Sequence, residues 1–508
     1  MVVPAHPRGA AQPGGHLHLK AFLRVKAMSD SSSSFLHVAF PAGIRIEQGE
    51  DGPRLWVRDE LLSLGVLPRA LWEAFAWLAE GSVSEDALVG QVEKAGGFQA
   101  VVFLHVALAK LARRGALRYL VQGPAGTLAT LEPLSPRFEL SSQPLASVRR
   151  LRLSRFAHVR REGEALVLES PRAHGRVVFG HAAALVLLAG LAMPTTPDAA
   201  VERLAPHEIP AALTLLELLF RTGFVLAAES DGNTEEEHRP ALAPWEFHDL
   251  LFHAASRRRL YGRRVGGTYR LAGTLAPPPV VPPPSEPAIV LPRPDLALLA
   301  RRDLPLVEAM ERRRSHREPG ARGLMLAHLG ELLFRCARVR QVHPGERDEE
   351  SSRPHPSGGA RYPLETYVVV GQCEGLEPGL YHHDAAGHRL EQRCGMTPTV
   401  RALLADAQVG SHPPRVLLIL AARFARTSFK YESIAYALIL KEAGVLLQSL
   451  SLAATAMGLA TCVVGRGNPE LFEQAAATEG AAESSVAEFA IHGCTPEGPP
   501  LAEPHSRP

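Results

Sequence analysis

The chain has little of what marks a disulfide-bonded, metal-binding or charge-driven protein. Its 508 residues include only five cysteines, all in the last third, and no pair is spaced as CxxC. An odd number without that spacing supports neither a disulfide framework nor a structural zinc site, and it suits a reducing compartment. The formal net charge is only +2, so the chain shows no preference for nucleic acid or an anionic membrane. We therefore expect a cytoplasmic protein without a metal site.

Long hydrophobic runs are also scarce. Residues 1–34 mix proline, glycine and histidine without the apolar core of a signal peptide, and we expect them to be disordered. The run 443–460, AGVLLQSLSLAATAMGLA, reaches the lower length limit for a membrane span. Glutamine, serine and threonine interrupt it, which favours a helix packed in the core or at a dimer interface.

Hydrophobic residues nevertheless make up 46% of the chain and charged residues 21%, as in a soluble protein with a sizeable core. The length predicts two to four domains. Residues 35–125 and 150–229 look alike, because each closes with a helix, a glycine and a strand, LARRGALRYLV in the first and LFRTGFVLAA in the second. In the second, LRLSRFAHVRR-EGE-ALVLES alternates like a hairpin. This order predicts two winged-helix-like domains.

A winged helix often binds DNA, but this chain lacks the basic residues for it. The candidate recognition helix, residues 209–222, has Arg221 as its only basic residue, and phosphate contacts need several Lys or Arg on one face. We therefore expect no nucleic-acid partner. A structural scaffold and peptide capture along an exposed wing strand both stay open. Residues 150–229 resemble the elements that bind leader peptides in ribosomal peptide modification, through EGEALVLES, MPTTPDAAVERL and LFRTGFVLAA.

The rest of the chain divides into a connector, a spacer and a larger domain. Residues 241–270 predict a connecting amphipathic helix. Residues 271–303 contain LAPPPVVPPPSEPAIVLPRP, which predicts an extended, semi-rigid spacer. From residue 304 to 497 the order of helices and strands, with one long helix between two strands, predicts an α+β domain.

Three motifs in that domain could bind a ligand. RRSHR at 313–317 groups guanidinium groups and a hydroxyl, which suits a phosphate or simply complements a helix dipole. PSGGA at 356–360 lets a flat ligand approach the backbone, or is a tight surface turn. This loop has neither GxGxxG nor a following Gly-Lys-Ser/Thr, so a nucleotide triphosphate or Rossmann site is disfavoured. GRG at 465–467 offers backbone N–H groups at a strand-to-helix turn.

Taken in order, RRSHR, PSGGA, GLYHHD, FKYES, the long apolar helix and VVGRGN resemble the SagB-type dehydrogenases of the flavin-dependent nitroreductase superfamily, over about Trp245 to Cys494. The resemblance implies a nitroreductase-like fold that holds FMN, usually at a homodimer interface. It implies FMN contacts from Arg313, Ser315, Arg317, Pro356, Ser357, Gly358, Gly359, Gly465 and Arg466.

The resemblance also assigns Lys430 and Tyr431 to catalysis. Family members oxidise thiazolines and oxazolines in modified peptides to thiazoles and oxazoles. This implies an azoline-containing precursor peptide as the substrate and a cyclodehydratase as a partner.

Removing a proton and a hydride from neighbouring ring carbons needs a base. We expect Lys430, desolvated at a helix start, to have a lowered pKa and to take the proton with help from Tyr431. The alternative without a catalytic role is a lysine that extends its charged end to solvent beside a tyrosine in the core. Two alternative functions stay open: a non-catalytic scaffold or leader-binding subunit, and a general flavin reductase of nitro or quinone compounds.

Overall fold

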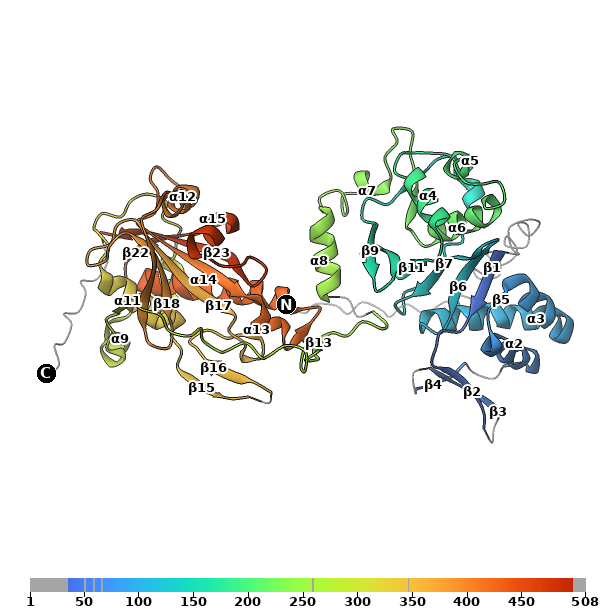
Figure 1. Cartoon of the computed structure of the whole chain (residues 1–508), viewed down its shortest axis with the longest axis horizontal. Helices are drawn as coiled ribbons and strands as arrows, with labels where there is room; N and C mark the ends of the chain where they lie inside the picture. Colours follow the sequence, from blue (N-terminus) through green and yellow to red (C-terminus); the bar gives the residue numbers. More distant parts are fainter. Residues whose placement is uncertain are drawn as a thin grey trace, which may run out of the picture. The chain divides into compact units, whose positions relative to one another are not determined.

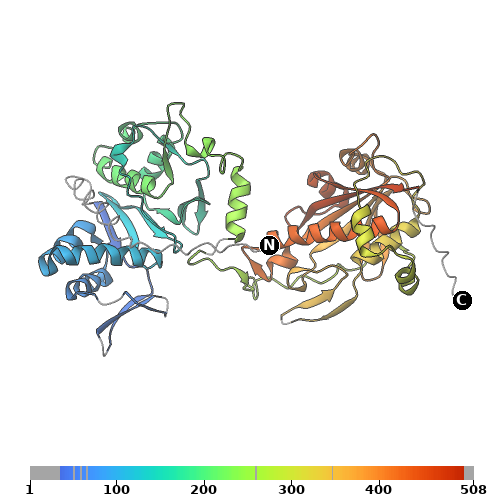
Figure 2. The ribbon, with the colours of Figure 1, turned by 180° about the vertical axis from the view of Figure 1, so that it is seen from behind.

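The structure is a computed structural model, and it describes residues 35–49, 52–57, 60–64, 67–257, 260–345 and 347–496. The segment 1–34, predicted to be disordered, lies outside the described residues. The chain divides into two compact units between Arg263 and Arg264. Figures 1 and 2 show the two units from opposite sides.

The first half of the N-terminal unit contains the predicted helices and strands. Its long helix begins at Ser84, whose side chain accepts the Ala87 N–H at 3.2 Å, and it kinks at Gly97, where φ is 69°. The predicted stop at Gly115 is confirmed, because Gly115 has a left-handed φ of 67°. The elements are β1 (Leu36–Ala39), β2 (Ile44–Gly49), β3 (Gly52–Val57), β4 (Glu60–Leu62), α2 (Arg69–Glu80), β5 (Val83–Ser84), α3 (Glu85–Arg113), β6 (Arg118–Gly123) and β7 (Gly126–Pro133).

The second half repeats part of this arrangement. Its predicted hairpin is confirmed, with Gly163 (φ 58°) in the turn between β9 and β10. Its first strand pairs with its last, β8 with β12, as β1 pairs with β6 in the first half. The elements are β8 (Leu151–Leu153), β9 (His158–Glu162), β10 (Ala165–Glu169), β11 (Gly175–Phe179), α4 (Ala182–Gly190), α5 (Pro197–Val201), α6 (Ile209–Arg221), β12 (Val225–Ala227), α7 (Glu235–His238) and α8 (Phe247–Arg257).

One antiparallel sheet joins the two halves, in the order β5-β1-β6-β7-β11-β10-β9 (Figure 1). The joining strand is β7, which lies between the two predicted domains and pairs with β6 on one side and β11 on the other. A single hydrophobic cluster contains buried residues of both halves, from Val38 to Val225. The prediction of two separate domains, 35–125 and 150–229, is therefore corrected, because the strand between them merges both halves into one unit.

The C-terminal unit is built on a seven-stranded antiparallel sheet, in the order β14-β19-β18-β17-β20-β23-β22. Helices α11 and α14 pack on one face and α12 and α15 on the other. The central strand β17 is buried along its whole length, and its adjacent Val368 and Val369 enter the two opposite clusters. These strands are β14 (Ala288–Val290), β17 (Leu364–Val370), β18 (Gly379–Asp384), β19 (Arg389–Gly395), β20 (Val416–Arg423), β22 (Leu459–Val464) and β23 (Glu483–Cys494).

Helices and two small sheets complete this unit. The hairpin of β15 and β16 extends from one side of the sheet (Figure 1). A second small sheet pairs β13 with β21. These elements are α9 (Leu296–Arg302), α10 (Leu306–Arg312), α11 (Leu326–Ala337), α12 (Pro398–Asp406), α13 (Phe424–Ser428), α14 (Ala435–Ala456), α15 (Pro469–Ala476), β13 (Gly266–Gly267), β15 (Gln341–Pro344), β16 (Glu349–Ser352) and β21 (Tyr431–Glu432).

The proline-rich segment belongs to the C-terminal unit, so the prediction of a spacer over 271–303 is wrong. Its strand β14 pairs with β19 at the edge of the sheet, and the Ser285 backbone N–H donates to the Glu391 carboxylate at 2.8 Å. Proline lacks an N–H but keeps its carbonyl, and Pro278 accepts from the Arg426 guanidinium at 2.8 Å. Among the described residues of the predicted connecting helix, 241–270, only Phe247–Arg257 are helical, as α8.

Within the described residues, two helices, α3 and α14, are long and apolar enough to cross a membrane by length and composition alone. Each also contributes buried side chains to a core cluster of its own unit, such as Leu104 from α3 and Leu446 from α14. The core position predicted for the apolar run 443–460 is confirmed for its inward face (Figure 2, orange-red helix).

Candidate active site

The predicted PSGGA loop is a strained turn directly before β17. It contains the single-turn helix η4 (Gly358–Ala360), inside which Gly359 has a left-handed φ of 64°. The Ser357 hydroxyl makes a short hydrogen bond to the Glu442 carboxylate of α14 and accepts the Tyr362 N–H at 2.9 Å. The Ser357 side chain therefore holds the loop in place, and the loop backbone is the part left to meet a ligand.

The sequence predicted Lys430 at the start of a helix, but the structure does not place it there. It lies between the short helix α13 and the two-residue strand β21, whereas α14 begins only at Ala435. β21 pairs with β13, so that Tyr431 lies opposite Gly267. Lys430 is therefore held by its backbone in a short extended segment.

The side chains of Lys430 and Tyr431 point toward the PSGGA loop. Lys430 Nζ is 3.4 Å from the Gly359 carbonyl oxygen and 3.5 Å from Glu350 Oε1. A Cβ atom added to Gly359 would lie 2.3 Å from the Tyr431 hydroxyl and 3.1 Å from Lys430 Nζ. The structure thus brings together three residues that the sequence predicted, Gly359, Lys430 and Tyr431.

The prediction of a lowered Lys430 pKa is wrong. Burial does lower this pKa, but Tyr269, Tyr431 and the Glu350 carboxylate raise it by more, and the net pKa lies above the ordinary value. The Lys430 side chain is only 19% exposed, so these neighbours are not fully screened by water. Lys430 is accordingly an ammonium ion at neutral pH.

Sequence reasoning missed two residues of this group, Tyr269 and Glu350. The Lys430 Nζ atom lies 5.8 Å from the centre of the Tyr269 ring, and the Tyr269 N–H donates to the Lys430 carbonyl at 3.1 Å. The buried Tyr269 hydroxyl has no hydrogen-bond partner in the described part of the chain. The only sequence signal was the polar stretch DEESS before the loop, which contains Glu350.

Backbone strain gathers around the same residues. Across the described ranges, six non-glycine residues have a positive φ, and four of them lie in the segments that meet here. Such conformations cost of order 1–3 kcal/mol each and persist where the surrounding structure imposes them, often at functional sites. The four are Tyr269 (φ 49°), Ala360 (φ 55°), Tyr362 (φ 43°) and Ser433 (φ 66°).

The second group of predicted residues is the basic segment after α10. Arg313, Ser315 and Arg317 are exposed, and neither arginine forms a salt bridge with a described carboxylate. The His316 N–H donates to the Thr461 carbonyl at 2.8 Å, which fixes the segment beside β22. Gly465 and Arg466 follow β22 and are exposed as well.

A buried histidine lies under this basic segment. The His492 carbonyl accepts the Gly320 N–H at 3.0 Å, and His492 Nε2 has no hydrogen-bond partner among the described residues. Burial lowers the His492 pKa, Glu318 opposes that effect, and His316 adds to it. Free guanidinium groups beside an unused imidazole fit an anionic ligand such as a phosphate.

The two groups of predicted residues do not meet within the chain. Gly358 packs against Leu438, near the start of α14. The basic segment, by contrast, is hydrogen-bonded through His316 to Thr461, which lies beyond the end of α14. The 22 residues of α14 span about 33 Å. Among the described residues no hydrogen bond or ion pair joins the basic segment to the PSGGA loop.

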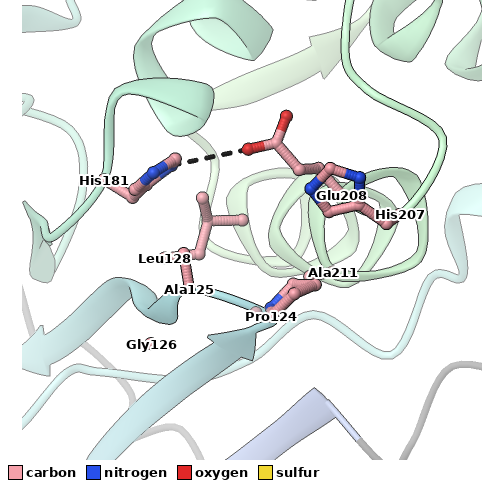
Figure 3. A pocket seen from close by; sticks show the side chains of 9 residues that line it. Pro124, Ala125, Gly126, Leu128, His181, His207, Glu208 and Ala211 are labelled. Carbon is pink, nitrogen blue, oxygen red and sulfur yellow. Dashed lines mark ion pairs between the residues drawn. The ribbon is translucent and has the colours of Figure 1, made fainter.

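Two hollows in the described part of the chain contain none of the predicted residues. Figure 3 shows one in the N-terminal unit, between the turn of β6 and β7 and the starts of α4 and α6, where His181 Nδ1 lies 3.6 Å from Glu208 Oε1. Two exposed groups could also offer metal ligands. These groups are Glu229, Asp231 and His238, and Glu246, His248 and Asp249.

Family models match two parts of the chain. Residues 310–488 match the nitroreductase family, and residues 151–261 match the cyanobactin oxidase ThcOx. MJ1384 of Methanocaldococcus jannaschii, a protein assigned to the nitroreductases, is 32% identical over 167 residues, which are 32% of this chain and 79% of that protein. The trifolitoxin-processing protein TfxB of Rhizobium leguminosarum bv. trifolii is 29% identical over 167 residues, 32% of this chain and 45% of TfxB.

Solved structures give a weaker likeness. A crystal structure of a Ralstonia eutropha protein described as a nitroreductase is 22% identical, with a TM-score of 0.33, over 46% of this chain and 98% of that one. A score this low supports no inference about the chain. The predicted resemblance of the C-terminal part to nitroreductases is confirmed by the sequence matches.

Proposed function

Because the chain belongs to the nitroreductase family, and is therefore an oxidoreductase, we propose that it oxidises thiazoline or oxazoline rings of a ribosomally made peptide to thiazoles or oxazoles. Two matches support a peptide substrate: the cyanobactin oxidase model over residues 151–261 and the protein named for trifolitoxin processing. The observation that carries the proposal is the convergence of Lys430 and Tyr431 on the Gly359 loop.

FMN is the cofactor we propose, and the residues present fit it. The exposed Arg313, Ser315 and Arg317 would hold the phosphate, together with the N–H groups of Gly465 and Arg466. Gly358 and Gly359 would line the flat ring system through their backbone, with Pro356 and Ser357 fixing the loop. Bound FMN would supply the hydride acceptor for the oxidation.

The chain's own residues would then bind and orient the ring and manage its proton. The loop backbone and Tyr431 would contact one side of a bound ring, and the Lys430 ammonium would stand beside it. A general flavin reductase of nitro or quinone compounds would need neither of these side chains.

A homodimer would bring the two groups of FMN-binding residues together. Among the described residues of one chain no hydrogen bond or ion pair joins the basic segment to the PSGGA loop, so a second copy would supply one of them. Exposed apolar side chains on α10 and α14 support such an interface. They are Leu306, Val307 and Met310 on α10, and Tyr436, Leu440 and Val445 on α14.

The N-terminal unit would hold the peptide or a partner enzyme. We propose that residues 150–229 are a winged-helix element that binds the leader of the precursor peptide. Strand β9 supports this, because it is the edge of the seven-stranded sheet and carries the exposed Val159. A cyclodehydratase, which makes the azoline, is the partner that the substrate requires.

The test combines a spectrum with a peptide assay. Purified protein should show the absorption of a flavin that is released as FMN, and it should remove two hydrogens per ring from a thiazoline peptide, as read by mass spectrometry. Lys430→Ala should keep FMN and lose most of this activity, with Lys94→Ala as the matched control. Colourless protein that still binds the leader would support the scaffold alternative, and turnover of nitro compounds alone would support the general reductase.

A further inference from the structure

The contacts of Lys430 decide which charge it carries during the reaction. Its Nζ atom faces the Glu350 carboxylate at 3.5 Å, the Gly359 carbonyl at 3.4 Å and the rings of Tyr269 and Tyr431 at 5.8 and 5.9 Å. Carboxylates, carbonyl oxygens and aromatic faces all stabilise a cation. None of these four contacts favours the neutral amine that a general base needs.

On the basis of the proposed azoline oxidation, we propose that Lys430 acts as an ammonium ion that stabilises negative charge developing on the ring. Glu350 takes the ring proton and passes it to solvent through His343. This assigns Glu350 the part of proton acceptor, which the sequence had suggested for Lys430. The raised pKa of Lys430 agrees with that division of roles.

The β15–β16 hairpin places the second and third members of this path. Glu350 and His343 are directly opposite in the antiparallel register. Glu350 Oε1 faces Lys430, while Glu350 Oε2 lies 3.9 Å from His343 Nε2. The exposed fractions are 19% for Lys430, 22% for Glu350 and 41% for His343, so the three side chains lead outward to water.

The hairpin is held firmly enough to keep Glu350 in place. Two residues before Glu350, the Asp348 carboxylate pairs with the buried guanidinium of Arg361, with Nη1 donating to Oδ1 at 2.8 Å. Arg426 Nη2 donates to the Glu349 carbonyl at 3.3 Å. The Arg347 guanidinium lies over the Tyr269 ring at 4.8 Å and adds a positive charge beside this cluster.

The oxidation removes one proton and one hydride from neighbouring carbons of the ring. The C–H bond next to the ring nitrogen breaks, and its proton goes to the Glu350 carboxylate. The neighbouring C–H bond would give its hydrogen and both electrons to bound FMN, so that the ring gains a double bond. The proton then leaves Glu350 through the facing imidazole of His343, which is the more exposed of the two side chains. Lys430 keeps its proton throughout.

Charge-preserving substitutions separate this proposal from a lysine base. With FMN-loaded full-length protein and a thiazoline peptide, Lys430→Arg should keep the single-turnover rate within about tenfold, whereas Lys430→Gln should lose about 100-fold. Glu350→Gln should lose about 100-fold or more. Glu349→Gln, next to it on the same hairpin, is the control and should match wild type. His343→Asn should slow turnover, and added imidazole should restore it.

The pH dependence gives a second test that does not rely on any variant folding. For wild type we expect a rate that stays flat from about pH 7 to pH 9, because the ammonium persists there. A rate that climbs about tenfold per pH unit over this range, together with inactive Lys430→Arg, would overturn the proposal and restore the lysine base. Loss of activity in Glu350→Gln that matches a loss in Glu349→Gln would also overturn it.

Amine labelling tests the charge of Lys430 without any substrate. Acylation of Lys430, read by peptide mass spectrometry against pH, should have a midpoint above that of an ordinary lysine, and Glu350→Gln should lower the midpoint. A Lys430 midpoint near neutral pH would refute the ammonium. If wild type fails to oxidise the peptide while the midpoint is raised, the proposed function is wrong and the charge assignment stands.

Discussion

The strongest structural prediction concerns Asp348, at the tip of the β15–β16 hairpin. Its side chain is 2% exposed and faces two fully buried guanidinium groups, those of Arg361 and Arg426. The two arginines also bind each other's backbone, Arg361 Nε to the Arg426 carbonyl at 3.1 Å and Arg426 Nε to the Arg361 carbonyl at 3.0 Å. Asp348 is therefore the carboxylate that neutralises a buried pair of cations.

The magnitude follows from the charges left behind. Burial first of all, and then the Arg361 charge, lower the Arg426 pKa to about 10, so Arg426 is still charged at neutral pH. Removing one partner of a buried ion pair typically costs about 3–5 kcal/mol, because the remaining charge stays buried and uncompensated. Since 1 kcal/mol lowers the Tm of a unit this size by about 2–4 °C, Asp348→Asn should lower it by about 6–20 °C.

The assay is thermal unfolding of the full-length protein, with hydrogen exchange to assign the transition to the C-terminal unit. Peptides covering 341–362 should lose protection first in Asp348→Asn. Glu308→Gln is the control, because Glu308 pairs with Arg312 on the surface and should change stability by less than about 1 kcal/mol. An Asp348→Asn protein whose Tm and exchange match the control would refute the argument that this carboxylate compensates buried charge.

Three further substitutions test the site and the core. Gly359→Ala should lower peptide oxidation at least tenfold, because its Cβ would overlap the Tyr431 hydroxyl at a left-handed φ, whereas Gly90→Ala in α3 has room and should leave activity unchanged. His382→Asn should abolish a pH dependence of stability that urea titrations of the wild type show. Burial lowers the His382 pKa, but two buried carboxylates raise it by more, so the net pKa lies above the ordinary value. The stabilisation by His382 is therefore present below about pH 6.5 and is lost as the pH rises through the raised pKa. Leu446→Ala should cost about 2–5 kcal/mol in the same titrations, because Leu446 is fully buried on α14; a cost under 1 kcal/mol would contradict its core position.

Local sequence patterns predicted the helices and hairpins well, because their signals lie within a few residues. The glycine stop at Gly115 and the hairpin turn at Gly163 are both present in the structure. Sheet partners are different, since they join strands that no local pattern connects. The pairing of β7 with β11, and of β14 with β19, was therefore not predictable, and the two-domain and spacer predictions failed there.

The candidate site also combines residues that a local motif reveals with residues that only the tertiary fold brings in. Gly359, Lys430 and Tyr431 could be chosen because each stands in a motif that resembles the SagB-type dehydrogenases. Tyr269 and Glu350 stand in no motif, and they reach Lys430 only because β13 pairs with β21 and the hairpin folds back on the loop. The pKa of Lys430 depends on those two residues, so its direction could not be predicted from the motif.

The charge state of Lys430 is therefore a tertiary property, and it changes what the motif means. A lysine–tyrosine pair beside a flat ligand suggests a base when it is seen alone. Surrounded by a carboxylate, a carbonyl and two aromatic faces, the same lysine is a fixed cation, and the nearest group able to take a proton is Glu350. If the charge on residue 430 matters and its basicity does not, arginine must replace lysine better than any neutral side chain does.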